Sequence, residues 1–239
     1  MISPRLARRV AQIHKWLGLI VFAQLVIWTA TGLFFAAIHI TDIRSDGLVH
    51  PANHLTPVNM AQVKINSTEA LNAVAEDRPF EVILRSLAGT PVYEVRAEIG
   101  TFLVSAESGD RVEIDEAFAR KIASATWVQP TPIRAMVELE KAPRESTVSG
   151  NVWAAHFEGE GDPTLYISAV NGRTSNPRTD LWRTYDFLYG LHLMDYTDHE
   201  NFNTPWMVAT AILALSTVLF GVALLVHRFT RGLIKDKTS

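Results

Sequence analysis

Residues 16–38 read WLGLIVFAQLVIWTATGLFFAAI, and residues 205–226 read PWMVATAILALSTVLFGVALLV. Neither stretch contains Asp, Glu, Lys or Arg. A helix of about 20 apolar residues is long enough to cross the ~30 Å hydrocarbon core of a bilayer. Because backbone polar groups in lipid must be paired within the segment, both stretches are expected to be helices. The sequence therefore predicts transmembrane helices over residues 16–38 and 205–226.

A cleaved signal peptide is the alternative interpretation of the first stretch. The apolar region of a signal peptide usually has about 7–15 residues and ends at a small-residue cleavage site. Residues 16–38 form a longer apolar stretch, and no clear cleavage site follows it. We therefore expect a signal-anchor that stays in the mature protein.

The charges that flank the two stretches predict their orientation. Arg5, Arg8, Arg9 and Lys15 precede the first stretch, and Arg228, Arg231, Lys235 and Lys237 follow the second. Residues 40–204 carry 24 acidic residues against 14 basic ones. By the positive-inside rule, residues 1–15 and 227–239 are expected in the cytoplasm and the central segment on the other side. In a bacterium this corresponds to the inner membrane with a periplasmic central domain.

Composition excludes several classes of function. The chain has no cysteine, which removes disulfides, thiolate metal sites and cysteine nucleophiles. The acidic central segment offers no basic patch, so nucleic-acid binding is not indicated. Neither a G-x-G-x-x-G motif nor a P-loop is present, so electrons used by this chain would come from a partner.

The central segment contains a weak internal duplication. TFLVSAESGDR (residues 101–111) resembles TLYISAVNGR (164–173). Upstream of these stretches, VYEVRAE (92–98) matches VWAAHFE (152–158). Alternating apolar and polar residues, followed by Ser-Gly or Asn-Gly, are typical of two strands and a turn. Each copy therefore predicts a small antiparallel sheet.

Helical patterns precede each copy. Ser67 and Thr68 are expected to cap a helix that continues to Ala75, and residues 116–125 suggest a second helix. Residues 133–140 are compatible with either helix or strand. The expected fold class is an α+β membrane protein, with two transmembrane helices that enclose a domain of two helix-plus-antiparallel-sheet units, over about 67–110 and 116–176.

Three motifs beside the predicted spans carry a family resemblance. They are HKWLGL (residues 14–19), WRTYDFLYGLHLMDY (182–196) and NFNTP (201–205). With the duplication, they resemble the PepSY-associated transmembrane protein family, in which a PepSY domain lies between membrane spans. The resemblance implies a periplasmic PepSY domain over residues 40–178, followed by an amphipathic pre-membrane segment over 179–204.

The same resemblance implies a function. The family includes b-haem membrane reductases for iron-siderophores, which have four spans where this chain has two. A homodimer would restore four helices. The implied role is electron transfer across the membrane, in iron or siderophore reduction or as a respiratory accessory. The chain would then be a haem-dependent reductase or an electron-transfer subunit with a separate redox partner.

Four histidines near the ends of the predicted spans are the candidate axial ligands of haem b: His14, His39, His192 and His227. A low-spin b haem takes two imidazoles, one on each face of the ring. The expected pairs are His14 with His227 and His39 with His192, within one chain or across a dimer. At 1.5 Å per residue, His14 and His39 would lie roughly 37 Å apart, near the two headgroup layers.

His14 stands inside the opening motif of the family, which makes it the strongest candidate. His192 falls on the apolar face of an amphipathic helix expected over residues 180–199, so it is expected to point toward the spans. The alternative for each histidine is a ring that rests at the membrane interface without a ligand.

Two further hypotheses remain open. One is a metal site for zinc, iron or manganese built from a cluster that matches no known spacing: His192, Asp195, Asp198, His199 and Glu200. The other is a non-catalytic, membrane-anchored binding or regulatory module, or an accessory subunit of a larger membrane complex. In that case the two spans are only anchors in the lipid bilayer.

Overall fold

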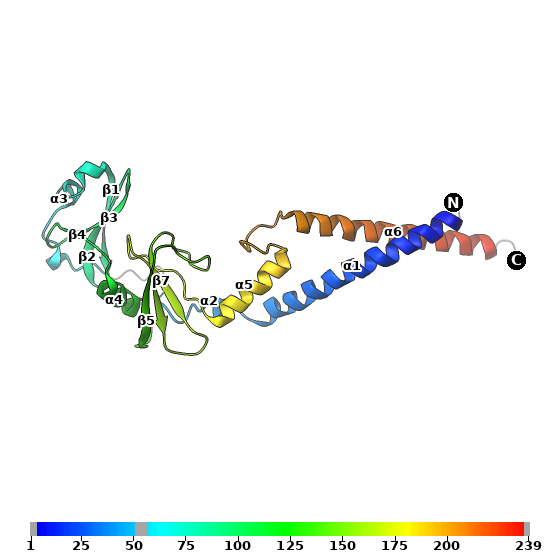
Figure 1. The fold of residues 1–239 in the computed structure, drawn as a ribbon, viewed down its shortest axis with the longest axis horizontal. Helices are drawn as coiled ribbons and strands as arrows, with labels where there is room; N and C mark the ends of the chain where they lie inside the picture. The colour runs from blue at the N-terminus through cyan, green and yellow to red at the C-terminus, as the bar shows by residue number, and fades with distance from the viewer. Residues whose placement is uncertain (1–3, 51–56, 237–239) are drawn as a thin grey trace. The chain divides into compact units, whose positions relative to one another are not determined.

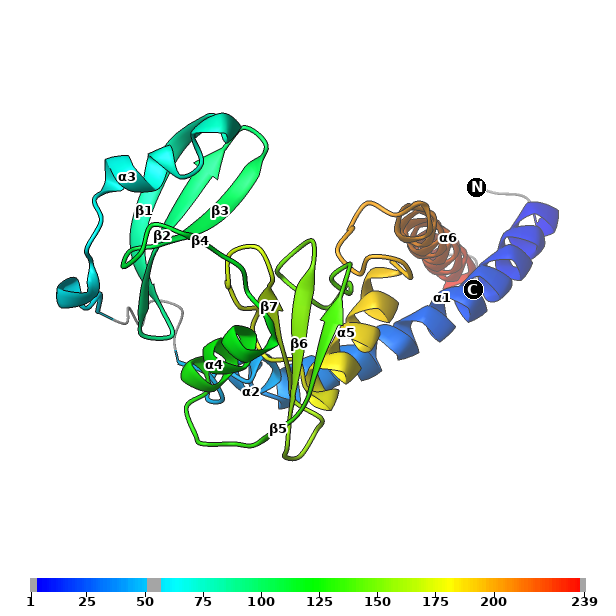
Figure 2. The same cartoon turned by 60° about the vertical axis from the view of Figure 1, so that its left-hand side comes forward.

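The computed structural model describes residues 4–50 and 57–236 (Figures 1 and 2). The chain forms two compact units. The helical unit combines Met1–Ile38 with Thr184–Ser239, and the sheet unit is His39–Arg183. Each unit has its own internal packing. The division agrees with the predicted central domain between two terminal apolar segments.

The helical unit contains the two long apolar helices that the sequence predicts. Helix α1 is Pro4–Ala37 and helix α6 is Pro205–Asp236. Within them, Arg8–Ala37 and Pro205–Thr230 are long and apolar enough to cross a membrane. The two helices run antiparallel, because Gly18 lies opposite Thr217 while Gly221 lies opposite His14.

One face of α1 forms a seam against the rest of the helical unit. Its partly or fully buried residues recur at alternating steps of four and three: Val10, His14, Leu17, Val21, Gln24, Trp28, Thr31 and Phe35. This is the heptad spacing of packed helices. The large apolar side chains between them, such as Leu19 and Phe22, are exposed. The seam therefore has polar members, while the outer face is suited to lipid.

Helix α5 is Asp180–Leu193, six residues shorter than the predicted helix over 180–199, which was wrong at its end. Met194 adopts a left-handed backbone with φ of 53°. The carboxylate of Asp195 then accepts backbone N–H bonds from the following loop: Thr197, Asp198, Glu200 and Asn201. A short acidic side chain that satisfies backbone donors favours a turn over a continued helix.

The sheet unit contains two antiparallel sheets, each preceded by a helix, as the duplication predicts (Figure 2). The first sheet has the order β1-β2-β3-β4: Pro79–Leu87, Thr90–Ala97, Gly100–Ser105 and Arg111–Val112. The second has the order β5-β6-β7: Ile133–Leu139, Val152–Phe157 and Thr164–Ser168. The ambiguous residues 133–140 are therefore mainly strand.

The remaining elements of the sheet unit are short. They are α2 Ile40–Arg44, the 3-10 helices η1 Met60–Gln62 and η2 Ala75–Asp77, α3 Ser67–Asn72 and α4 Glu116–Thr126. The cap of α3 is Asn66, so the prediction of Ser67 and Thr68 as caps was wrong. Asn66 and Glu69 form a reciprocal capping box, in which each side chain accepts from the backbone N–H of the other residue.

The core of the sheet unit is continuous between the two sheets. Leu103 of β3, Ile122 of α4 and Ile167 of β7 belong to one buried cluster, so α4 and both sheets share it. On the other face of the first sheet, Ala70 of α3 packs with Tyr93 and Val95 in a second cluster. The first sheet is thus covered on both faces.

A buried carboxylate also links the two sheets. Glu94 of β2 is 1% exposed. It pairs with Arg85 at 2.9 Å, with Arg173 at 3.0 Å and with Arg96 at 3.6 Å. Arg173 follows β7, so this ion cluster joins the second sheet to the first.

Candidate functional site

His192 of α5 is fixed against α1 within the helical unit. Its Nδ1 lies 2.8 Å from Oγ1 of Thr31, and Thr31 is 4% exposed. One turn back, the indole of Trp28 donates to the backbone carbonyl of His192 at 2.9 Å. These two contacts confirm that His192 points toward the first apolar helix.

The hydrogen bonds of Thr31 favour one tautomer of His192. The Thr31 hydroxyl also lies 2.8 Å from the carbonyl oxygen of Ile27, one turn earlier in α1. A hydroxyl has one proton, and threonines in helices normally donate it to this carbonyl. Thr31 then accepts from Nδ1–H of His192. This tautomer leaves the lone pair on Nε2, the atom through which imidazole commonly binds a metal.

Aromatic rings surround the imidazole of His192. Phe35 meets it edge-on at a centroid distance of 5.5 Å, and Trp28 lies at 6.3 Å. Tyr185 and Tyr189 of α5 stack on each other at 5.7 Å, and both contact Phe35. This cluster locks α5 onto the C-terminal half of α1 and gives His192 an apolar environment.

His14 lies in the seam between α1 and α6. Its Cε1 is 3.2 Å from the place where a Cβ on Gly221 would lie, so a side chain at this position would press against the ring. Its Nδ1 is buried and has no hydrogen-bond partner among the residues that the structure describes. A buried polar atom without a partner is costly and needs an explanation.

His227 lies on α6 at the same end of the helix pair. Its Nε2 is also buried without a hydrogen-bond partner within the described part of the chain. His227 is six residues beyond Gly221, the residue opposite His14, which is about 9 Å along the axis. Nε2 of Gln24, further along the α1 seam, is a third buried atom of this kind.

His39 has a different environment, at the start of the sheet unit. It is exposed and caps α2, and its Nδ1 accepts from the backbone N–H of Thr41 at 3.4 Å. The hydroxyl of Thr41 lies 2.7 Å from the same nitrogen. In the neutral ring the proton is then on Nε2, which leaves no lone pair for a metal. His39 would have to give up its cap before it could bind iron.

The structure does not assemble the predicted metal cluster over residues 192–200. No group of three or more His, Cys, Asp or Glu side chains among the described residues is placed to hold a metal. Asp195 is occupied by backbone donors, and Nδ1–H of His199 donates to the carboxylate of Asp186 at 2.9 Å. His192 lies on α5, and the other members of the cluster belong to a structured loop between α5 and α6.

Sequence reasoning did not identify Thr31 or Gly221 as partners of the histidines. The step of four and three from His14 to Gln24, Trp28 and Thr31 could have indicated a common face of α1. Nothing in the sequence relates Thr31 to His192, which lies 161 residues away.

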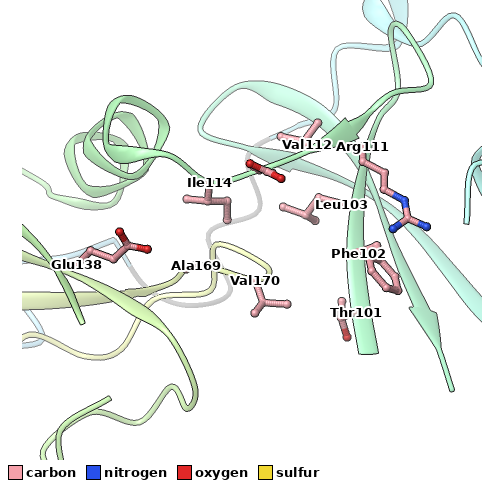
Figure 3. Close-up of a pocket in the computed structure, with 10 residues that line it drawn as sticks. Thr101, Phe102, Leu103, Arg111, Val112, Ile114, Glu138, Ala169 and Val170 are labelled. Carbon is pink, nitrogen blue, oxygen red and sulfur yellow. The ribbon is translucent and has the colours of Figure 1, made fainter. Parts of the chain in front are cut away.

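The sheet unit carries a separate pocket of about 380 Å³ (Figure 3). It is lined by ten residues from four segments: Thr101, Phe102, Leu103, Arg111, Val112, Glu113, Ile114, Glu138, Ala169 and Val170. In Figure 3 apolar side chains form its floor, with Arg111 on one side and Glu138 on the other. Its volume lies within the range of roughly 300–1,000 Å³ that small ligands occupy.

Comparisons with known proteins found no family model that matches this chain. No curated protein and no solved structure matches it either.

Proposed function

We propose that this chain is a PepSY-type b-haem protein of the bacterial inner membrane, which carries electrons from one face of the bilayer to the other. In this proposal α1 and α6 cross the bilayer and the sheet unit is periplasmic. The exposed apolar side chains of both helices and the flanking basic residues support this placement. No Asp, Glu, Lys or Arg lies in residues 16–38 or 205–226.

The observation that carries the proposal is the state of three ring nitrogens in the helical unit. In the tautomer that Thr31 favours, Nδ1–H of His192 donates to Thr31 and Nε2 keeps its lone pair. Nδ1 of His14 and Nε2 of His227 are buried without partners among the described residues. Imidazole is a normal axial ligand of haem iron. A ligated iron would remove the cost of leaving these nitrogens unpaired.

His14, His192 and His227 would hold haem, and bound haem would supply one-electron redox chemistry. Thr31 would act as a positioning residue, since it fixes the tautomer and the orientation of His192. Thr31 and His14 are 17 residues apart on α1, which is roughly 25 Å. The candidate ligands therefore divide into two groups near opposite ends of the helix pair, as a transmembrane carrier needs.

The remaining axial ligands would come from His39, after its cap opens, or from a second copy of the chain. A homodimer would supply four helices and a second set of the same histidines. A redox partner must deliver the electrons, because the chain has no nucleotide-binding motif. The chain would then serve as a membrane reductase or as the electron-transfer subunit of a larger complex.

The test is a dithionite-reduced minus oxidised visible spectrum of the full-length protein in detergent, after expression with added haem precursor. A pyridine haemochrome assay gives the stoichiometry. We expect sharp α and Soret bands that are reduced in His14→Ala and His192→Ala. His156→Ala is the matched control, because His156 lies on β6 and bonds to Thr164 within the sheet unit.

The second candidate function is a membrane-anchored binding module, and the pocket of the sheet unit favours it. The same spectrum separates the two functions. A featureless spectrum from folded protein, expressed with adequate haem supply, would exclude the haem carrier and favour the binding module.

A further inference from the structure

The pocket of the sheet unit runs along the edge of a β-strand. Leu103 of β3 faces the core that both sheets share, whereas Phe102 packs with the cluster on the α3 face. Side chains on opposite faces of one strand both line the pocket. The pocket must therefore lie beside the strand edge. Figure 3 shows Thr101, Phe102 and Leu103 following one another along this side.

The edge of β3 is open beside the pocket. β4 has only two residues, and it pairs with β3 through Leu103↔Val112 and Val104↔Arg111. The next hydrogen-bonded pair in this register would be Thr101 with Ile114, but β4 ends at Val112. The carbonyl of Ile114 accepts instead from the indole of Trp153 at 2.8 Å.

The backbone groups of Thr101 point toward this opening. In an antiparallel strand, the N–H and C=O of alternate residues point to the same side. The N–H of Ser105 donates to Asp110 on the β4 side, so Leu103 and Thr101 share that direction. No backbone hydrogen bond to Thr101 occurs on this side among the described residues. One donor and one acceptor are therefore available to an added strand.

The charge around the pocket is uneven. Arg111 is already engaged, because it pairs with Asp77 and lies 4.5 Å from the centre of the Phe102 ring. Glu113 and Glu138 are exposed, and neither has an ion pair or hydrogen bond within the described ranges. The uncompensated charge at the pocket is therefore negative.

We propose that an extended segment of another polypeptide adds to the edge of β3, and that the segment carries a Lys or Arg side chain. Its backbone would form a pair of hydrogen bonds with Thr101, in the manner of strand addition. Its basic side chain would lie over the apolar floor and reach Glu113 and Glu138. This interaction uses only residues of the sheet unit, so it does not depend on haem.

The experiment measures the fluorescence anisotropy of a labelled peptide titrated with full-length protein in detergent. The probe is a short, end-blocked peptide of alternating Val and Thr with one central Lys. We expect saturable binding that is roughly tenfold weaker when Glu replaces the central Lys, because like charges then face each other. Glu138→Gln should weaken binding of the Lys peptide about two- to fivefold.

A backbone variant tests the strand edge itself. Thr101→Pro removes the outward N–H, and proline is tolerated at a strand position whose N–H faces away from the sheet. Binding should weaken roughly five- to tenfold, the effect of losing one hydrogen bond. Thr101→Val retains the N–H and is the matched control, for which binding should not change. Both variants should show wild-type circular dichroism.

Three results would overturn the proposal. They are absence of binding by the Lys peptide, equal binding of the Lys and Glu peptides, and equal binding to Thr101→Pro and Thr101→Val. The haem proposal survives each of these results, and a featureless haem spectrum leaves the peptide titration unaffected.

Discussion

Oγ1 of Thr31 and Nδ1 of His192 lie 2.8 Å apart, and this contact joins the first long helix to the segment that precedes the last. Because Thr31 also bonds to Ile27, the contact favours one tautomer of the histidine. It therefore links a packing interaction of the helical unit to the metal-binding capacity that we propose for His192.

Thr31→Val tests this link, since valine keeps the shape of threonine and removes the hydroxyl. Haem bound through His192 should transfer to apomyoglobin about 10–100-fold faster, as expected when a partner of a metal ligand is lost. Thr29→Val is the control. Thr29 makes the same bond to its own helix at 2.7 Å but is exposed. Equal transfer rates in the two variants would contradict the assigned role of Thr31.

Gly221→Leu tests the contact between α1 and α6. The new side chain must displace His14, whose Cε1 is 3.2 Å from the Cβ position. We expect a loss of about 1–3 kcal/mol in the free energy of unfolding, measured in mixed micelles. Gly32→Leu should be neutral, because nothing lies within 4 Å of the Cβ position there. A destabilised Gly32→Leu with a stable Gly221→Leu would show that the seam is assigned to the wrong face.

Glu94→Gln should destabilise the sheet unit strongly. Burial lowers the pKa of Arg85 while Glu94 raises it, so the carboxylate compensates a partly buried guanidinium. Removing one partner of a buried ion pair costs about 3–5 kcal/mol. Urea unfolding followed by near-UV circular dichroism measures the change. Glu81 pairs with Arg96, and its side chain is 41% exposed. Glu81→Gln should therefore lower the free energy of unfolding by less than about 1 kcal/mol.

The loop after α5 should be insensitive to mild acid. The backbone N–H of Asn201, with the N–H and hydroxyl of Thr197 and the N–H of Glu200, holds the pKa of Asp195 well below its usual range, although desolvation opposes this. A carboxyl with a lowered pKa stabilises the fold above its unfolded-state pKa, and this contribution is lost as the pH falls through the folded-state value.

Hydrogen exchange measures this effect directly. Protection of the Thr197, Glu200 and Asn201 amides should stay constant from neutral pH to about pH 4 and decline only in stronger acid, after correction for intrinsic rates. In Asp195→Asn these amides should exchange faster at every pH. Glu200→Gln is the comparison, because the exposed Glu200 contributes its backbone N–H to this network. If its loop amides exchanged as fast as those of Asp195→Asn, Asp195 would not be the centre of the loop.

The sequence predicts those parts of the fold whose signals are local. The absence of charge from residues 16–38 and 205–226 is sufficient to indicate α1 and α6. The Ser-Gly and Asn-Gly turns indicate the duplicated strands. The consecutive apolar residues Val82, Ile83 and Leu84 are compatible with helix or strand, so β1 is not apparent from periodicity.

The candidate site is less predictable because its contacts are distant in sequence. The end of α5 depends on a carboxylate that collects donors as far as Asn201. The choice of tautomer at His192 depends on Thr31, and the position of His14 depends on Gly221. Residue type identified the histidines as candidates, but only the fold shows that Nδ1 of His39 is already engaged.

The polar seam of α1 has a consequence for biosynthesis. If α1 enters the bilayer as proposed, it does so long before the ribosome has made α5 and α6. Until those helices arrive, Gln24 and Thr31 face lipid, where exposed polar side chains are costly. An interrupted chain therefore exposes to membrane proteases polar side chains of α1 that α5 and α6 cover in the complete fold.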